Sequence, residues 1–201
     1  MPSKKVITPI LAGKFYHLYN RGINRQEVFF TAANYHFFLQ LIHQHLTDYC
    51  NVLAYALLPN HFHLIVEIKG SLMQKDKVMD DKEPSNLFIN QFRRLLISYT
   101  MAINKQEKRS GSLFDSRYKR LLIESEEYLK YLVFYCHFNP EKHGLTRDFT
   151  NYSFSSYNAY VSGKPTQIHR DFMIEIFGGL DNLIAFHQIM HEERSLLILE
   201  D

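Results

Sequence analysis

Apolar and polar positions alternate along several short segments, in the pattern of β-strands. The alternation predicts four strands, at 14–22, 50–60, 61–69 and 113–124. The second and third strands meet at Pro59-Asn60, a residue pair typical of turns, so we expect a hairpin there. The first strand ends at Gly22, where we expect one of the turn conformations that other residues avoid.

Helical periodicity appears between and after these strands. Apolar residues recur every three or four positions in 34–49, in a long segment that follows 70–85, and in a helix that begins at Ser125. Pro140 is expected to end this last helix, because proline disfavours helical conformation in the residue before it. The stretch 70–85 is polar, highly charged and without periodicity, which predicts a loop.

The order of these elements predicts an α+β fold. Strand, helix, strand, strand, helix, strand and helix follow one another, which favours a ferredoxin-like antiparallel sheet with helices packed on it. We expect one domain at 1–165, followed by an acidic helical C-terminal extension at 166–201 that contains two short amphipathic helices. The fold class by itself predicts no function.

Composition limits the class of protein and its location in the cell. No apolar run approaches the length that crosses a bilayer, and the basic start of the chain does not resemble a signal peptide. Cys50 and Cys136 are too few for a disulfide framework or for a zinc site built from cysteine. A cytoplasmic protein without a membrane partner is therefore expected.

The distribution of charge is more informative than the net charge of +2. Residues 88–120 hold eight basic and two acidic side chains, and residues 1–22 hold four basic side chains and no acidic one. The last 31 residues hold seven acidic side chains against Arg194 alone. A basic body with an acidic tail is compatible with a polyanion such as nucleic acid, although charged runs also occur on ordinary solvated faces.

Two histidines interrupt the apolar strand 61–69. Because side chains alternate between the faces of a strand, His61 and His63 share one face while the apolar residues between and after them share the core face. Two imidazoles at this spacing can both reach one divalent ion. They can equally be a pair of exposed or hydrogen-bonded histidines.

A third ligand and a reactive group lie on the helix that begins at Ser125. One stripe of this helix is apolar, and a second stripe contains Tyr135 and Asn139, four residues apart on one face. An amide oxygen suits Mg²⁺ or Mn²⁺, and a tyrosine hydroxyl beside such an ion can attack phosphorus. The alternative is that these aromatic residues only pack, and His137 is expected on the surface, opposite the tyrosine stripe.

Together these segments resemble a known family. The stretches "LPNHFHLIV", "GSLFDSRYKRLLIES", "EYLKYLVFYCHFNPEKHG" and "YSFSSYNAY" are similar, in this order, to the motifs of the single-tyrosine HUH transposases. The similarity is greatest to the REP-associated tyrosine transposases, a branch related to the insertion-sequence 200/605 superfamily. "YHLYNRGINRQEVFF" resembles the first strand of that family, so the resemblance spans about 14–162.

The resemblance implies an activity and a set of site residues. It implies cleavage and rejoining of single-stranded, hairpin-forming or repetitive DNA through a 5′-phosphotyrosine intermediate. Tyr135 matches the catalytic nucleophile, and His61, His63 and Asn139 match the ligands of a divalent metal, Mg²⁺ or Mn²⁺. Basic and polar side chains nearby are expected to contact DNA, namely Asn20, Arg21, Arg117, Lys119 and Arg120.

Several alternatives stay open at this stage. Tyr99 is a rival nucleophile, but it lies on the apolar face of its helix, where Ile103 follows four residues later. The protein could be a non-catalytic DNA-binding regulator descended from a transposase. It could also be a metal-dependent hydrolase that uses the histidines and Glu67 with water as the nucleophile. A homodimer is possible, in which case the tyrosine helix would serve either its own chain or the partner.

Overall fold

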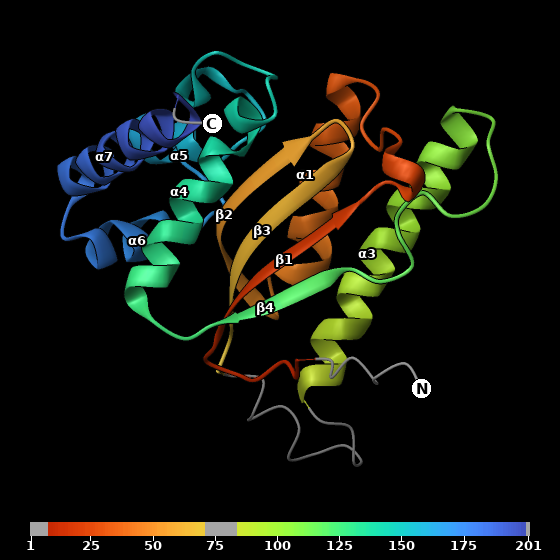
Figure 1. Ribbon diagram of the computed structural model, residues 1–201. Helices are drawn as coiled ribbons and strands as arrows, with labels where there is room; N and C mark the ends of the chain where they lie inside the picture. The colour runs from red at the N-terminus through yellow and green to blue at the C-terminus, as the bar shows by residue number, and fades with distance from the viewer. Residues whose placement is uncertain (1–7, 71–83, 200–201) are drawn as a thin grey trace, which may run out of the picture.

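The computed structural model describes residues 8–70 and 84–199, with a four-stranded sheet at the centre (Figure 1). The strands are β1 (Phe15–Arg21), β2 (Cys50–Leu58), β3 (His61–Ile68) and β4 (Lys119–Ile123). Their order in the sheet is β2-β3-β1-β4, and each neighbouring pair is antiparallel. The strand expected at 113–124 is thus shorter than its alternating pattern.

Helices cover both faces of this sheet (Figure 1). Their bounds are α1 (Ala32–Leu46), α3 (Pro84–Gln106), α4 (Glu126–Lys142), α5 (Tyr157–Val161), α6 (Arg170–Phe177) and α7 (Leu180–Leu199). The order β1-α1-β2-β3-α3-β4 with this strand arrangement is the ferredoxin-like one, so the predicted α+β fold is confirmed. Most of the expected loop at 70–85 lies outside the described residues.

The face of β3 opposite the histidines forms the main core with α1 and α3. Phe62, Leu64, Val66 and Ile68 are all buried in this core, as the alternation predicts. Phe62 contacts the rings of Phe38 from α1 and Phe92 from α3, with ring centroids 5.1 and 6.3 Å away. This packing fixes which face of β3 each histidine occupies.

None of the helices in the described part of the chain is long and apolar enough to cross a membrane.

Helix α4 lies on the other face of the sheet and packs through its predicted apolar stripe. Leu129, Leu132, Val133 and Cys136 are buried there together with Ile65 of β3. At its start, the Ser125 side chain accepts a hydrogen bond from the Tyr128 N–H at 3.1 Å, which satisfies an otherwise unpaired donor of the first turn.

The prediction that Pro140 ends α4 is wrong. The helix continues to Lys142, and Asn139 remains in helical conformation despite the proline that follows it. The stop comes at Gly144, which has φ of 69° and whose N–H bonds to the Glu141 carbonyl at 2.8 Å. A left-handed glycine is an effective helix end because it has no Cβ to clash. The extra turn carries Lys142 back toward the tyrosine stripe.

The C-terminal helices α5, α6 and α7 pack beside α4 (Figure 1), and α6 also reaches the sheet, where Phe172 stacks on Phe15 with ring centroids 6.1 Å apart. His137, expected on the surface, is fully buried there. His137 Nδ1 lies 2.9 Å from His187 Nε2 of α7, and His137 Nε2 lies 2.8 Å from Ser156 Oγ. The prediction failed because the acidic tail covers this side of α4.

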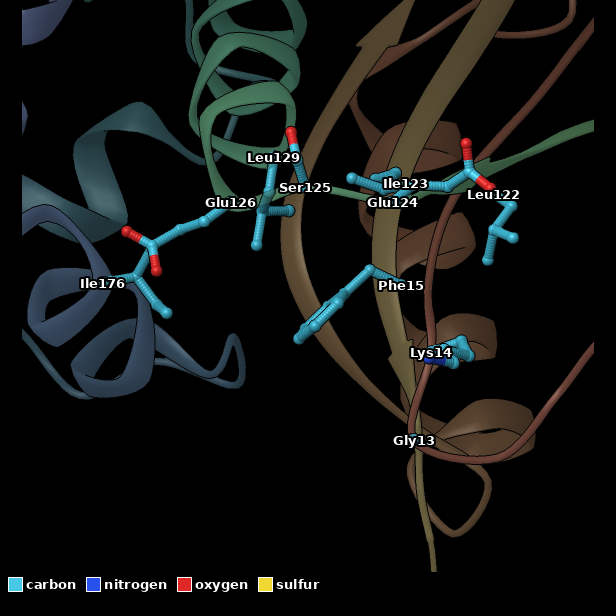
Figure 2. Close-up of a pocket in the computed structure, with 10 residues that line it drawn as sticks. All are labelled: Gly13, Lys14, Phe15, Leu122, Ile123, Glu124, Ser125, Glu126, Leu129 and Ile176. Atoms are coloured by element: carbon cyan, nitrogen blue, oxygen red, sulfur yellow. The ribbon is translucent and has the colours of Figure 1, made fainter.

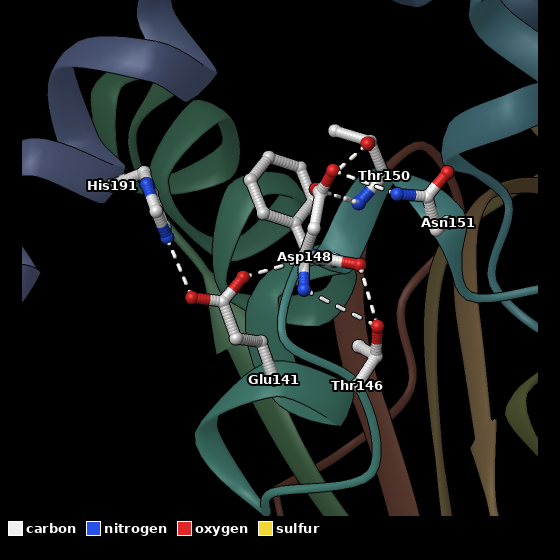
Figure 3. A network of polar contacts seen from close by, with 7 residues as sticks. Glu141, Thr146, Asp148, Thr150, Asn151 and His191 are labelled. Carbon is white, nitrogen blue, oxygen red and sulfur yellow. Dashed lines mark hydrogen bonds and ion pairs between the residues drawn. The ribbon is translucent and has the colours of Figure 1, made fainter.

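The turn after α4 is fixed by a polar network that also reaches α7 (Figure 3). Glu141 accepts from the Phe149 N–H at 2.9 Å and lies 2.6 Å from His191 Nε2. Asp148 accepts from the Thr150 N–H at 2.9 Å and from the Asn151 side chain at 2.8 Å. These contacts hold the C-terminal end of α4 against the tail.

Gly22, at the end of β1, is explained by close packing and not by an unusual turn. Its φ of −62° and ψ of 142° are ordinary extended values, so the expected special conformation is wrong. A Cβ at this position would lie 2.0 Å from the Gln26 carbonyl oxygen, a contact that no side chain can make. Glycine therefore lets the next segment fold back directly beside the histidine end of the sheet.

The buried His187 predicts that stability falls in weak acid. Its Nδ1–H donates to the Leu183 carbonyl at 2.8 Å, and burial lowers its pKa to about 4. Between about pH 6.5 and 4 the unfolded chain binds a proton that the folded chain refuses, so the free energy of unfolding decreases as pH falls. For one group of this kind the loss is roughly 3 kcal/mol across that range.

Urea unfolding of the wild type and of His187→Phe, measured from pH 7.5 to pH 4, tests this expectation. The variant lacks both the hydrogen bonds and the titration of His187. Its unfolding free energy should therefore be lower than that of the wild type at pH 7.5, and this difference should shrink as pH falls. A deficit that is the same at every pH would contradict the assignment.

Candidate functional site

The two histidines of β3 lie at the end of the sheet where β1 also ends. In the antiparallel register, Arg21 of β1 pairs with His61 and Tyr19 pairs with His63, so these side chains share one face. The rings of His61 and His63 lie edge to face with centroids 5.2 Å apart. His63 is buried and His61 is partly exposed, which leaves one imidazole accessible from solvent.

Helix α4 brings Tyr135 and Asn139 onto this same face. The ring centroids of Tyr135 and His63 are 6.0 Å apart, and Asn139 Oδ1 lies 3.3 Å from His61 Nε2. Asn139 is fully buried, whereas Tyr135 is partly exposed. The structure thus gathers all four predicted residues at one point, between β3 and α4 of the same chain. Their chemical roles stay predictions.

His61 lies between two hydrogen-bond acceptors. Asn60 Nδ2 donates to the Arg25 carbonyl at 3.2 Å, so Asn60 Oδ1 is the atom that lies 2.6 Å from His61 Nδ1. Burial, with nearby charge from His143 and Arg21, lowers the pKa of His61 to about 4, although its contact with Asn139 raises it. A neutral imidazole has a single N–H. Because Asn60 Oδ1 can only accept, this hydrogen lies on His61 Nδ1, which donates to Asn60.

On the other side of the ring, a lone pair of His61 then faces a lone pair of Asn139. His61 Nε2 faces Asn139 Oδ1 at 3.3 Å, and with the N–H directed to Asn60 neither atom can donate to the other. Asn139 Nδ2 is also buried without a hydrogen-bond partner in the described structure. A cation between the imidazole nitrogen and the amide oxygen would satisfy both lone pairs, so these residues fit a divalent metal.

The candidate ligand set contains no carboxylate and no sulfur. Within the described ranges, no group of three or more His, Cys, Asp or Glu side chains could hold a metal ion. The set here is two imidazoles and one amide oxygen, which leaves further positions for water or phosphate oxygens. Such an open set of nitrogen and oxygen ligands differs from a structural zinc site, in which protein side chains fill all four positions.

His63 has a partner that the sequence did not reveal. His17, on β1, lies with its Nε2 2.8 Å from His63 Nδ1, and the two rings are stacked at 5.1 Å. Burial lowers the pKa of His17 to about 4, and burial together with the charges of neighbouring groups lowers the pKa of His63 well below its usual value. Both imidazoles are therefore neutral at pH 7.

Lys142 is the second residue that the sequence did not reveal. Its Nζ lies 3.4 Å from the Tyr135 hydroxyl and 4.9 Å from the centre of the Tyr135 ring. The residue was hidden because the helix was expected to end at Pro140. His17 lies on β1 two positions before Tyr19, so strand alternation places both side chains on one face of the sheet. The contact of His17 with His63, however, depends on how β1 pairs with β3.

The residues expected to contact DNA do not all lie on the histidine face. Lys119 pairs with Tyr19, which pairs with His63, so Lys119 lies on that face and is exposed. Arg120 pairs with Leu18 and therefore lies on the face covered by α1 and α3. Lys119 is consequently better placed than Arg120 to meet a phosphate at the site.

The remaining three residues lie around the end of β1. Arg21 is on the histidine face and forms an exposed ion pair with Asp115 at 2.9 Å. Asn20 is buried, donates to the Asp115 carbonyl at 3.2 Å and accepts from the Arg21 N–H. Arg117 is exposed in the segment before β4. Asn20 thus supports the loop that carries Asp115, and its proposed DNA contact stays a prediction.

The rival residues lie away from this cluster. Tyr99 is fully buried in the core on the opposite face of the sheet, and its hydroxyl donates to the Val28 carbonyl at 2.7 Å. Glu67 is four residues along β3 from His63, about 13 Å away, and accepts from the Asn51 side chain at 3.0 Å. Neither residue can join the histidines in a single reaction.

A cavity of about 430 Å³ lies near the opposite end of β1 (Figure 2). Apolar side chains and two acidic residues, Glu124 and Glu126, line it together with Lys14. None of the four clustered residues contributes to its lining. The cavity is therefore separate from the histidine cluster, and its acidic side chains do not suit a polyanion.

Comparisons with known proteins show a similarity in fold. No protein-family model matches the chain, and no curated protein is similar to it in sequence. Its fold is similar to the solved structure of a REP-associated tyrosine transposase bound to a REP hairpin, with a TM-score of 0.60 over 82% of this chain and 90% of that one. The two sequences are 19% identical, so this likeness establishes the shared α+β architecture.

Proposed function

We propose that this protein is a transposase-like endonuclease and strand transferase that acts on single-stranded DNA, with Tyr135 as the nucleophile. The observation that carries the proposal is the meeting of Tyr135 with His61, His63 and Asn139 on one face of the sheet. The resemblance of the motifs and the hairpin-bound structural neighbour support hairpin-forming or repetitive DNA as the substrate.

The reaction would proceed by direct attack of Tyr135 on a backbone phosphorus. The phenolic oxygen loses its proton and bonds to phosphorus, the bond from phosphorus to the 3′ oxygen breaks, and that oxygen leaves as a 3′-OH with a proton from solvent. The 5′ end of the cleaved strand is then esterified to the tyrosine. Because one phosphodiester replaces another, the 3′-OH of a second strand can reverse the step and rejoin DNA.

His61, His63 and Asn139 would hold the divalent cation that this chemistry uses. When bound, Mg²⁺ or Mn²⁺ would supply a Lewis acid that polarises the scissile phosphate and orients it. Asn139 and Tyr135 share one face of α4, so the helix fixes the separation between this metal ligand and the attacking hydroxyl.

Replacement of Tyr135 by Phe tests the proposal. Incubation of hairpin-bearing single-stranded DNA with the wild type and Mn²⁺ should give a covalent protein–DNA adduct on a denaturing gel, and Tyr135→Phe should give none. The matched control is Tyr131→Phe, one turn earlier on the same stripe, which should retain the adduct.

Two results would contradict the proposal. DNA binding without an adduct, over several hairpins and metals, would indicate a non-catalytic regulator. Cleavage that persists in Tyr135→Phe would indicate a hydrolase that uses water.

Lys142 is expected to accelerate adduct formation. Its ammonium group donates to the Tyr135 hydroxyl and would stabilise the negative charge that develops on that oxygen during attack. Lys142→Met should slow single-turnover adduct formation about tenfold, equivalent to about 1.4 kcal/mol in the barrier. Lys142→Arg should recover most of the rate, and equal rates in all three proteins would exclude this role.

Lys119 and Arg120 form a matched pair for testing the DNA-binding face. Lys119→Ala should weaken hairpin binding and reduce the slope of log affinity against log salt by about one, because one phosphate contact is lost. Arg120→Ala should change the slope less, since Arg120 lies on the opposite face. Fluorescence anisotropy across a salt series measures both, and a larger effect for Arg120 would place the DNA elsewhere.

A further inference from the structure

We propose that His17 and Asn60 are positioning residues that hold His63 and His61 in the tautomer with hydrogen on Nδ1, so that both Nε2 lone pairs face the metal site. The inference rests on the proposed function, because the two lone pairs matter only if His61 and His63 bind a cation. It adds to the site an outer layer of two residues to which the resemblance assigns no role.

The case of Asn60 follows from a chain of donors and acceptors. The backbone carbonyl of Arg25 can only accept, so the Asn60 amide group that faces it is Nδ2, at 3.2 Å. Asn60 Oδ1 is left to face His61 Nδ1 at 2.6 Å, and an amide oxygen also can only accept. His61 Nδ1 must therefore carry the hydrogen. Its Nε2 is then free, on the side of Asn139.

The His17–His63 contact allows two arrangements. In the first, His63 Nδ1–H donates to His17 Nε2, and the His63 Nε2 lone pair is free. In the second, His17 Nε2–H donates to His63 Nδ1, and His63 Nε2 carries a hydrogen that blocks a metal. In both arrangements His17 Nδ1 is buried without a partner among the described residues, so that atom does not choose between them.

The parallel with His61 favours the first arrangement. Nδ1 of His61 faces Asn60 and Nδ1 of His63 faces His17, so in the first arrangement each histidine uses Nδ1 for support from the protein and keeps Nε2 for the site. A metal-binding histidine commonly donates its other N–H to an outer partner, which fixes the ring and its tautomer.

His17 is suited to this role by its rigidity. It is 4% exposed, it is stacked against His63, and its ring also lies 4.9 Å from that of Tyr19. Its backbone is fixed in β1, where residues 17 and 65 are paired across the sheet. An acceptor held this firmly can fix the His63 ring with little freedom to rotate.

The tautomers can be measured directly in the metal-free protein. Long-range ¹⁵N–¹H spectra of the imidazole rings should show hydrogen on Nδ1 of both His61 and His63 in the wild type. In His17→Phe, the His63 signals should change to the Nε2–H pattern or to a mixture, while the His61 signals stay as they are. Asn60→Ala should give the converse result.

Metal affinity provides a second readout. Mn²⁺ titration followed by electron paramagnetic resonance should show ten- to a hundredfold weaker binding in His17→Phe. His17→Gln, whose amide oxygen can accept from His63, should recover most of the affinity. The matched control is His36→Gln, which removes an exposed histidine on α1 and should change neither readout.

The outcomes separate this inference from the proposed function. A wild-type His63 with hydrogen on Nε2 in the presence of saturating Mg²⁺ would overturn the inference, and so would a folded His17→Phe with unchanged tautomers and Mn²⁺ affinity. If the wild type shows the expected tautomers, and these depend on His17, but forms no adduct with DNA, the positioning role stands and the nuclease proposal fails. The wild-type spectrum decides the first point even if His17→Phe does not fold.

Discussion

The side-chain alternation of β3 is the constraint on which the rest of the site depends. Phe62 and Leu64 are buried against α1 and α3, and this burial directs His61 and His63 to the opposite face. A shift of one residue in the pairing with β1 would exchange the two faces, burying imidazoles in the apolar core. The cost of that exchange makes the register, and hence the place of the histidines, unambiguous.

Helix α4 is held from two sides, which leaves its tyrosine stripe for the site. Its apolar stripe packs on the sheet through residues such as Val133, while His137 on another side is hydrogen-bonded to His187 of the tail. The acidic extension therefore supports the helix that carries Tyr135, and it also covers the far end of the histidine face, where Phe172 of α6 stacks on Phe15 with ring centroids 6.1 Å apart. Arg194, the one Lys or Arg among the last 31 residues, contacts the ring of Tyr131 on the stripe.

Local patterns predicted the elements and the four clustered residues, because each depends on periodicity within one strand or one helix. The alternation of β3 places His61 and His63 together, and helical spacing places Tyr135 beside Asn139. His17 was missed because its contact with His63 arises only from the pairing of two distant strands. His137 was misplaced because the helix α7 that buries it lies 50 residues later in the chain. The extent of α4 was misjudged because Gly144, and not Pro140, provides the stop.

The similarity in fold and the proposed chemistry rest on different observations. A ferredoxin-like sheet occurs with many functions, and 19% identity over a similar architecture does not choose among them. The proposed chemistry is supported by a local conflict in hydrogen bonding. His61 lies between acceptors on both sides, Asn60 and Asn139, and one neutral imidazole can satisfy only one of them. A divalent cation between the two atoms would satisfy both lone pairs, and it would lie on the face of the sheet toward which α4 directs Tyr135.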